Sequence, residues 1–143
     1  MTRCPLPPVA AVVSFIDRIN HGDVPGLAGL MTDDHRLVVL DESPVVGKAA
    51  NTAAWEGYAA AFPDYVVYPH EIVERDGRVA VAGHTTGSHL GLPDEQEAQL
   101  TIIWLADITD GRLSSWHILE DTPAARADLG LAPLPKPSEP TDG

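Results

Sequence analysis

The stretch that decides the fold is residues 113–130, LSSWHILEDTPAARADLG, near the carboxyl end of the chain. Its first half predicts a strand, in which successive side chains face opposite ways. One row is Leu113, Ser115, His117, Leu119 and Asp121, and the other is Ser114, Trp116, Ile118 and Glu120. Because both rows contain apolar residues, we expect this strand to be covered on both faces. His117 and Asp121 would then be shielded from water at the floor of a cavity.

The second half predicts a short helix over 123–129 that ends at Gly130. Asp121, just before it, has two interpretations. It is either the cap of this helix, a role that suits Asp, or a general base whose pKa is raised toward neutrality by burial. His117 is likewise either a core residue whose imidazole has its hydrogen bonds satisfied or a catalytic residue. The sequence leaves both choices open.

In the rest of the chain, the spacing of apolar residues changes at Pro63 from a helical period to a strand period. Before it, the spacing of apolar residues predicts helices over 8–20, 24–31 and 48–62, with short strands at 36–40 and 45–46. After it, four strands are expected over 65–75, 78–90, 97–108 and 113–122, joined by turns at 76–77, 92–94 and 110–111. This order predicts an α+β fold with helices on one face of a curved sheet.

Length, charge and cysteine content limit the class of protein. The chain has 143 residues, so we expect one domain over 8–132, between disordered ends at 1–7 and 133–143. The single cysteine, Cys4, and the absence of a secretory signal or an 18-residue apolar run lead us to expect a cytoplasmic protein outside the membrane. A net charge of −12, from 9 basic and 21 acidic residues, disfavours binding to nucleic acid or anionic lipid.

Short motifs in a particular order carry a family resemblance. They are Asn20-His21-Gly22-Asp23, Val46-Gly47-Lys48, Phe62-Pro63-Asp64, GSHLG at 87–91, Asp110-Gly111-Arg112-Leu113 and the segment 121–130. Together they resemble the SnoaL-like, polyketide cyclase-like group of the nuclear transport factor 2-like superfamily. The resemblance implies a cone-shaped antiparallel or mixed sheet with three amino-terminal helices on its concave face. It also implies a homodimer through the outer sheet face, with Trp116 and Ile118 covered there.

The same resemblance implies which residues are catalytic and where they lie in the fold. SnoaL-like cyclases use an Asp base in the hollow of the sheet and need neither a metal nor a cofactor. We therefore expect Asp121 to be the base, with His89 or His117 as proton donor or oxyanion partner. Between the histidines of the fourth strand, the resemblance favours His89 and leaves His84 in reserve.

Strand pairing decides which of these side chains meet. A two-residue turn at Asp110-Gly111 would pair Trp104 with His117. If His84 also pairs with Trp104, the three form a band across the cavity floor. A slip of one residue would bring His89 to Asp121 instead, because it turns over every side chain. The residues alone do not choose between these registers.

The remaining candidates lie at the rim and in the core. Asp41 and Asp64 lie at strand ends, where a carboxylate either reaches the cavity mouth or is solvated. Four aromatic residues have two interpretations, first as core residues and second as the wall of an apolar pocket. They are Phe15, Trp55, Tyr58 and Trp104. Tyr58 is also placed to donate to an oxyanion. The spacing of the six histidines is not typical of a metal site, so no metal is expected.

These observations predict an enzyme that performs cofactor-free acid–base chemistry on a small molecule. The reaction would be of cyclase, isomerase or dehydratase type, on a mostly apolar, carbonyl-containing substrate. One alternative is a module of the same fold that binds a small ligand or a partner without turnover. Another is an epoxide hydrolase-type enzyme, which requires Asp41 or Asp64 to point inward.

Overall fold

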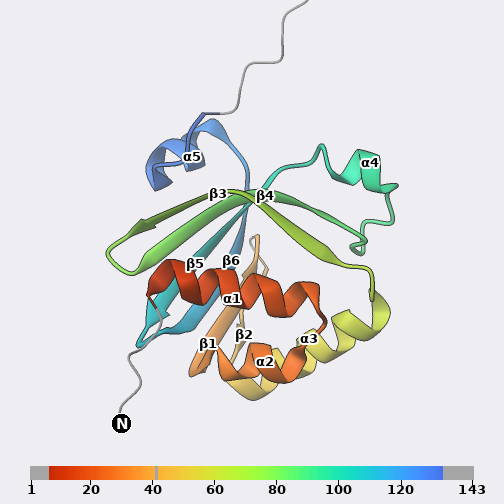
Figure 1. Cartoon of the computed structure of the whole chain (residues 1–143), viewed down its shortest axis with the longest axis vertical. Helices are drawn as coiled ribbons and strands as arrows, with labels where there is room; N and C mark the ends of the chain where they lie inside the picture. The colour runs from red at the N-terminus through yellow and green to blue at the C-terminus, as the bar shows by residue number, and fades with distance from the viewer. Residues whose placement is uncertain (1–6, 41, 134–143) are drawn as a thin grey trace, which may run out of the picture.

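The computed structural model describes residues 7–40 and 42–133 (Figure 1). The elements in chain order are α1 (Pro8–Asn20), α2 (Val24–Gly29), β1 (Met31–Val39), β2 (Val45–Val46), α3 (Lys48–Ala61), β3 (Val66–Arg75), β4 (Arg78–Thr86), α4 (Asp94–Glu97), β5 (Ile102–Thr109), β6 (Arg112–Glu120) and α5 (Pro123–Leu129). The ends predicted as disordered lie outside the described residues except for Pro7 and Pro133. None of the helices described in these ranges is long and apolar enough to cross a membrane.

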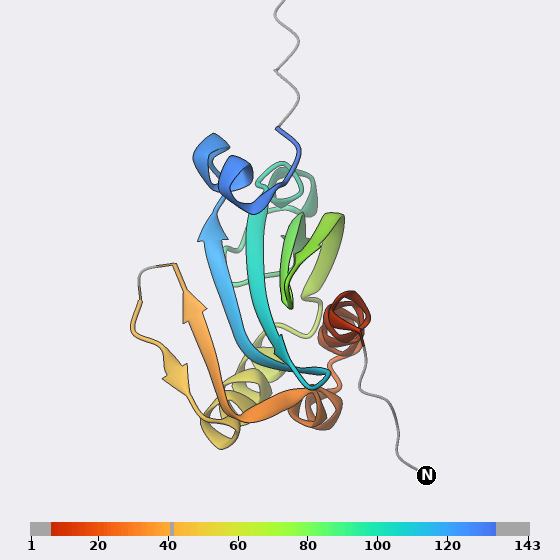
Figure 2. The ribbon, with the colours of Figure 1, turned by 90° about the vertical axis from the view of Figure 1, so that its left-hand side faces the viewer.

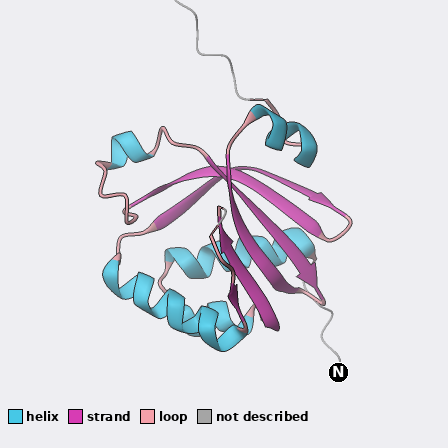
Figure 3. Cartoon of the chain, turned by 180° about the vertical axis from the view of Figure 1, so that it is seen from behind, coloured by secondary structure: helices cyan, strands magenta, loops and turns pink. Residues whose placement is uncertain are grey.

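The strands form one curved, mixed sheet in the order β2-β1-β6-β5-β4-β3 (Figure 2). Only the β1–β6 pair is parallel, and the other neighbours run antiparallel. Helices α1, α2 and α3 lie together on one side of the sheet (Figure 3). The predicted fold class is therefore confirmed, although β1 begins at Met31, inside the segment predicted as the end of the second helix.

The main core lies between the sheet and these helices. Phe15 on α1 is fully buried, and its ring centroid lies 5.0 Å from that of Trp116 and 6.3 Å from that of Trp55. Removing such an aromatic side chain costs about 3–5 kcal/mol of folding free energy. A smaller core on the outer face joins Ala82 and Ile103 to Leu131, which follows α5.

The register between β5 and β6 differs from the predicted one. Thr109 pairs with Arg112 as expected, but the register shifts by one residue between Asp107 and Ile108. Ser114 is the extra residue of this β-bulge, and every side chain beyond a bulge is turned over.

The bulge reverses the predicted faces of β6. Trp104 pairs with Ile118, while His117 pairs with Leu105. Trp116 packs in the main core and Ile118 lies against it, on the helix side. The predicted placement of Trp116 and Ile118 on the outer face is therefore wrong, and the homodimer stays a prediction without that support.

Strand β4 ends at Thr86, earlier than predicted, and the next residue has a left-handed backbone conformation that favours glycine. Gly87 has a φ of +69°, and a Cβ there would lie 2.4 Å from the carbonyl oxygen of Asp64. The chain therefore turns out of the sheet, and α4 follows at Asp94–Glu97, where the next strand was predicted to begin. His89 is consequently carried by a turn, so strand alternation does not decide its direction.

Candidate functional site

A cavity of about 460 Å³ is lined by α3 and by the ends of β1, β4, β5 and β6. Its volume falls in the range of small-molecule sites. Most of its wall is apolar, formed by Leu37, Val39, Trp55, Tyr65, Ile102, Trp104 and Ile118 among others. The predicted site residues that line it are Trp55, Tyr58, His89, Trp104 and Asp121. Their roles toward a substrate stay predictions.

Tyr58 and His89 form a hydrogen-bonded pair in the cavity wall, here called the Tyr58–His89 pair. The Tyr58 Oη lies 3.0 Å from His89 Nδ1, and the backbone N–H of His89 donates to the same oxygen at 3.2 Å. The phenol either donates its proton to Nδ1 or accepts one from it, depending on the imidazole tautomer. His89 is exposed, so this pair stands where the cavity meets solvent.

The surroundings of Tyr58 keep its phenol neutral. Burial raises the pKa of Tyr58, the bonds with His89 and Ser88 lower it, and the charge of Glu97 raises it. The balance is a raised pKa, so Tyr58 retains its proton at neutral pH and can donate a hydrogen bond. Thr85 and Ser88 add two hydroxyl groups to the same part of the wall.

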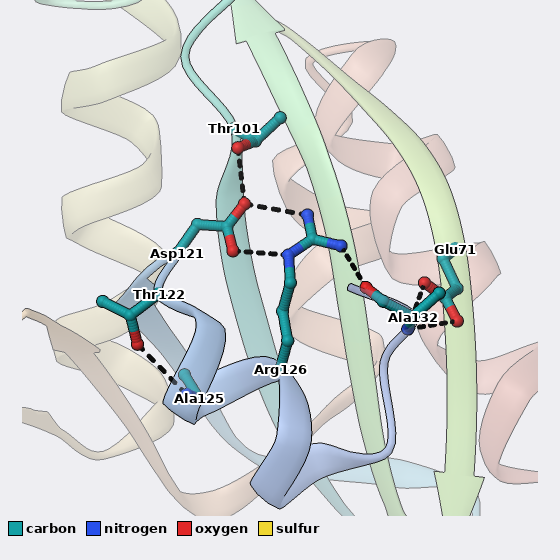
Figure 4. Close-up of polar contacts among 7 residues, drawn as sticks. All are labelled: Glu71, Thr101, Asp121, Thr122, Ala125, Arg126 and Ala132. Atoms are coloured by element: carbon teal, nitrogen blue, oxygen red, sulfur yellow. Dashed lines mark hydrogen bonds and ion pairs between the residues drawn. The ribbon is translucent and has the colours of Figure 1, made fainter. Parts of the chain in front are cut away.

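Asp121 is held in a buried ion pair, here called the Asp121–Arg126 pair (Figure 4). Arg126 donates from Nε to Oδ1 at 2.6 Å and from Nη2 to Oδ2 at 2.8 Å. The hydroxyl of Thr101 donates to Oδ2 at 2.5 Å. The side chains of Asp121 and Arg126 are 3% and 7% exposed. Both carboxylate oxygens are therefore occupied.

These contacts overturn the predicted electrostatics of Asp121. The hydrogen bonds from Arg126 lower its pKa, Thr101 lowers it further, and burial opposes them only in part. Asp121 is therefore more acidic than an ordinary Asp, whereas a base raised toward neutrality was predicted. The sequence did not indicate that Arg126, five residues along, would reach back to it.

The capping interpretation of Asp121 is also wrong. Thr122 is the N-cap of α5, and its hydroxyl accepts from the backbone N–H of Ala125 at 3.1 Å. Arg126 also donates to the carbonyl of Ala132 at 2.8 Å, and the carboxylate of Glu71 accepts from the backbone N–H of Ala132 at 3.0 Å. Asp121 and Arg126 therefore fasten α5 and the segment after it to the sheet (Figure 4).

Two predicted histidines lie outside the cavity. His117 is turned to the outer side by the bulge, where its Nε2 lies 3.4 Å from the carbonyl oxygen of Leu40. His84 pairs with Tyr68 across the strands and stacks on its ring at 4.6 Å. Val81, not His84, pairs with Trp104. The predicted band of His84, Trp104 and His117 is therefore wrong.

His84 instead lies 2.7 Å from His70, measured between His84 Nδ1 and His70 Nε2. This contact was missed because it joins two strands and has no local spacing. Within the described part of the chain, no group of three or more His, Cys, Asp or Glu side chains could hold a metal ion.

The other predicted residues are separate from the cavity. Phe15 is fully buried in the main core, so it is not a pocket wall. Asp64 is exposed and does not line the cavity. Asp41 lies outside the described residues.

Comparison with known proteins places the chain in a family. The profile of the SnoaL-like domain matches residues 12–116. The chain belongs to the SnoaL-like domain family. No curated protein sequence matches this SnoaL-like chain at a significant level.

Solved structures support the same fold. A candidate polyketide cyclase from Sinorhizobium meliloti is 24% identical, with a TM-score of 0.63, covering 79% of this chain and 94% of that one. A candidate SnoaL-like polyketide cyclase from Jannaschia sp. is 19% identical, with a TM-score of 0.64, covering 93% and 99%. The epoxide hydrolase/cyclase-like enzyme SalBIII of salinomycin pyran ring formation is 15% identical, with a TM-score of 0.65, covering 80% and 91%. At these identities the likeness concerns the fold alone.

Proposed function

We propose that this SnoaL-like protein is an enzyme that performs cofactor-free acid–base chemistry on a neutral, mostly apolar substrate with a carbonyl group. The reaction is of cyclase, isomerase or dehydratase type. The observation that carries the proposal is the Tyr58–His89 pair, two proton-exchanging side chains that meet within 3.0 Å in the wall of an apolar cavity. His89, not Asp121, is the base in this proposal.

The proposed chemistry starts from the tautomer in which His89 Nδ1–H donates to Tyr58 Oη. His89 Nε2 then removes a proton from the carbon beside the carbonyl, while the Tyr58 hydroxyl donates a hydrogen bond to the oxygen that becomes an enolate. The imidazolium returns this proton to another carbon in an isomerisation, or to a departing hydroxyl in a dehydration. In an aldol cyclisation, the enolate carbon attacks a second carbonyl, and the proton goes to the new alkoxide.

The charge of the wall supports a neutral substrate. Glu42 and Glu120 line the cavity beside the paired Asp121, and its described lining contains no Lys or Arg. The chain as a whole carries a net charge of −12. This field repels carboxylate and phosphate groups, so an uncharged ketone, lactone or diketone fits the cavity better than an anion.

The experiment follows exchange of the α-hydrogens of cyclic ketones, lactones and diketones in D₂O by NMR, which detects enolate formation without knowledge of the final product. We expect the wild type to accelerate exchange, and His89→Gln to lose about 100-fold or more of that acceleration. The matched control is His70→Gln, an exposed histidine outside the cavity lining. Equal rates for wild type and His89→Gln would overturn the proposal.

A second candidate is a small-ligand-binding module of the same fold. The observation that favours it is Asp121, the carboxylate predicted as the base, whose two oxygens are occupied by Arg126 and Thr101. In the same NMR experiment, this candidate predicts chemical-shift changes at cavity residues on ligand addition without any exchange. An epoxide hydrolase-type reaction was predicted to need Asp41 or Asp64 pointing inward; Asp64 does not line the cavity, and Asp41 lies outside the described residues.

A further inference from the structure

Glu97 is a buried carboxyl group that has no cationic partner among the ion pairs of the described residues. It is the last residue of α4, and it is 1% exposed although its helix neighbours Asp94, Glu95 and Gln96 are exposed. None of the ion pairs found among the described residues includes it. Burying a carboxylate without a cation costs several kcal/mol unless hydrogen bonds offset it.

The hydrogen bonds of Glu97 come from the cavity wall. The hydroxyl of Thr85 donates to Oε2, and the backbone N–H of Ser88 donates to Oε1 at 3.4 Å. Thr85 and Ser88 both line the cavity. Glu97 therefore stands behind this part of the wall and holds two of its residues.

The hydrogen bond between Glu97 and Ser88 lies one residue away from the Tyr58–His89 pair. Ser88 directly precedes His89, whose backbone N–H and Nδ1 both bond to Tyr58 Oη. The turn that carries them leaves β4 at Gly87, so sheet hydrogen bonds do not fix it. The titratable groups that feel the charge of Glu97 are Tyr58, Tyr65 and His84.

We propose that Glu97 is a positioning residue, whose side-chain carboxyl group holds the turn at Ser88 and thereby fixes His89 against Tyr58. The inference deepens the proposed function, since it names the group that arranges the proposed catalytic pair. Glu97 itself touches Thr85 and Ser88 and acts through them. The structural statement can nevertheless be tested without any substrate.

The test compares Glu97→Gln with Glu95→Gln, an exposed glutamate on the same helix, using ¹⁵N-histidine and ¹³Cζ-tyrosine NMR. We expect the His89 Nδ1 resonance of Glu97→Gln to move toward its position in Tyr58→Phe. We also expect the pKa of Tyr58 to fall, because the charge of Glu97 is one of the causes that raise it. Glu95→Gln should match the wild type in both. A folded Glu97→Gln protein with wild-type values would overturn the proposal.

A second variant decides the question if Glu97→Gln does not fold. Thr85→Val keeps the carboxylate and removes the hydroxyl that donates to it, so the same movement of the His89 resonance is expected. A folded Thr85→Val protein with an unchanged His89 resonance would overturn the proposal. Because these signals are recorded without substrate, a failure of α-hydrogen exchange counts against the proposed function alone.

Discussion

Two polar pairs meet the same cavity and are built from different chemistry. One contributes Asp121 alone to the cavity lining, and the other contributes both Tyr58 and His89. Asp121 and Arg126 are oppositely charged, buried and joined by two hydrogen bonds, with Thr101 as a third partner. Tyr58 and His89 are joined by one hydrogen bond between side chains and one from the backbone, and His89 is exposed. The first pair ties α5 to the sheet, while the second meets solvent at the cavity wall.

The difference shows why a perturbed pKa is not by itself a sign of catalysis. The lowered pKa of Asp121 comes first from Arg126, as in a structural ion pair. A carboxylate held in this way is a weak base, because removing a proton from a substrate would require breaking its bonds to the guanidinium. The raised pKa of Tyr58 leaves a neutral donor beside an imidazole, which is suited to proton transfer.

The largest effect on stability is expected from Arg126→Met. This change leaves Asp121 buried without its cation and should lower the free energy of unfolding by about 3–5 kcal/mol. Urea denaturation at pH 7 measures it, and Arg112→Met, at an exposed position, is the control. A loss below about 1 kcal/mol would mean that the pair does not fasten α5.

Tyr58→Phe should show that the Tyr58–His89 pair contributes mainly to activity, whereas the Asp121–Arg126 pair contributes mainly to stability. It removes the hydroxyl and should slow α-hydrogen exchange by about 100-fold, as for the loss of an oxyanion donor. The cost in stability should be about 1 kcal/mol, since the lost hydrogen bonds are between neutral groups. Tyr68→Phe, on an exposed tyrosine outside the cavity lining, is the control. Loss of stability without loss of exchange would assign Tyr58 a structural role only.

The ion pair should show a characteristic pH dependence. The pKa of Asp121 in the folded protein lies below the ordinary value of 3.8, so its contribution to stability is present above that pH. This contribution is lost as the pH falls through the folded-state pKa, by at most about 1.4 kcal/mol per pH unit. The stability difference between wild type and Asp121→Asn should therefore be constant from pH 5 to 8 and shrink below about pH 4. A difference that does not change with acid would contradict the lowered pKa.

The smallest effect tests which residue caps α5. Thr122→Ala removes the hydroxyl that accepts from Ala125 and should cost about 1 kcal/mol. Thr122→Ser keeps the hydroxyl and should retain most of that stability. If both variants were as stable as the wild type, the capping role of Thr122 would be excluded.

The parts of the fold set by local chemistry could be predicted from the sequence. The Asp-Gly turns adopt positive φ at Asp76, Gly77, Asp110 and Gly111, as two-residue hairpins require, and Gly130 ends α5 in the left-handed conformation. The order of helices and strands followed from periodicity. These features depend on residues that are close together in the sequence, so a local pattern is enough to predict them.

The site was less predictable because its contacts join distant segments. The bulge at Ser114 has no glycine or proline to mark it, yet it turned His117 away from the cavity. Arg126 looked like an ordinary surface residue of a short helix. Glu97 lies in a run of polar residues, and its burial and its bonds to Thr85 and Ser88 distinguish it from Glu95 only in the folded structure. No local pattern distinguishes such residues from their neighbours.

The β-bulge in β6 makes strand register a determinant of ligand chemistry. If β6 kept the unbroken register that the turn at 110–111 sets, His117 and not Ile118 would lie opposite Trp104, so an imidazole would replace an aliphatic side chain there. Accommodating Ser114 as a bulge thus keeps an apolar surface in the cavity where a titratable one would otherwise lie, with no change in composition. Related chains of the same length whose hairpin lacks this bulge should therefore differ in what their cavities accept, even when their aligned residues look alike.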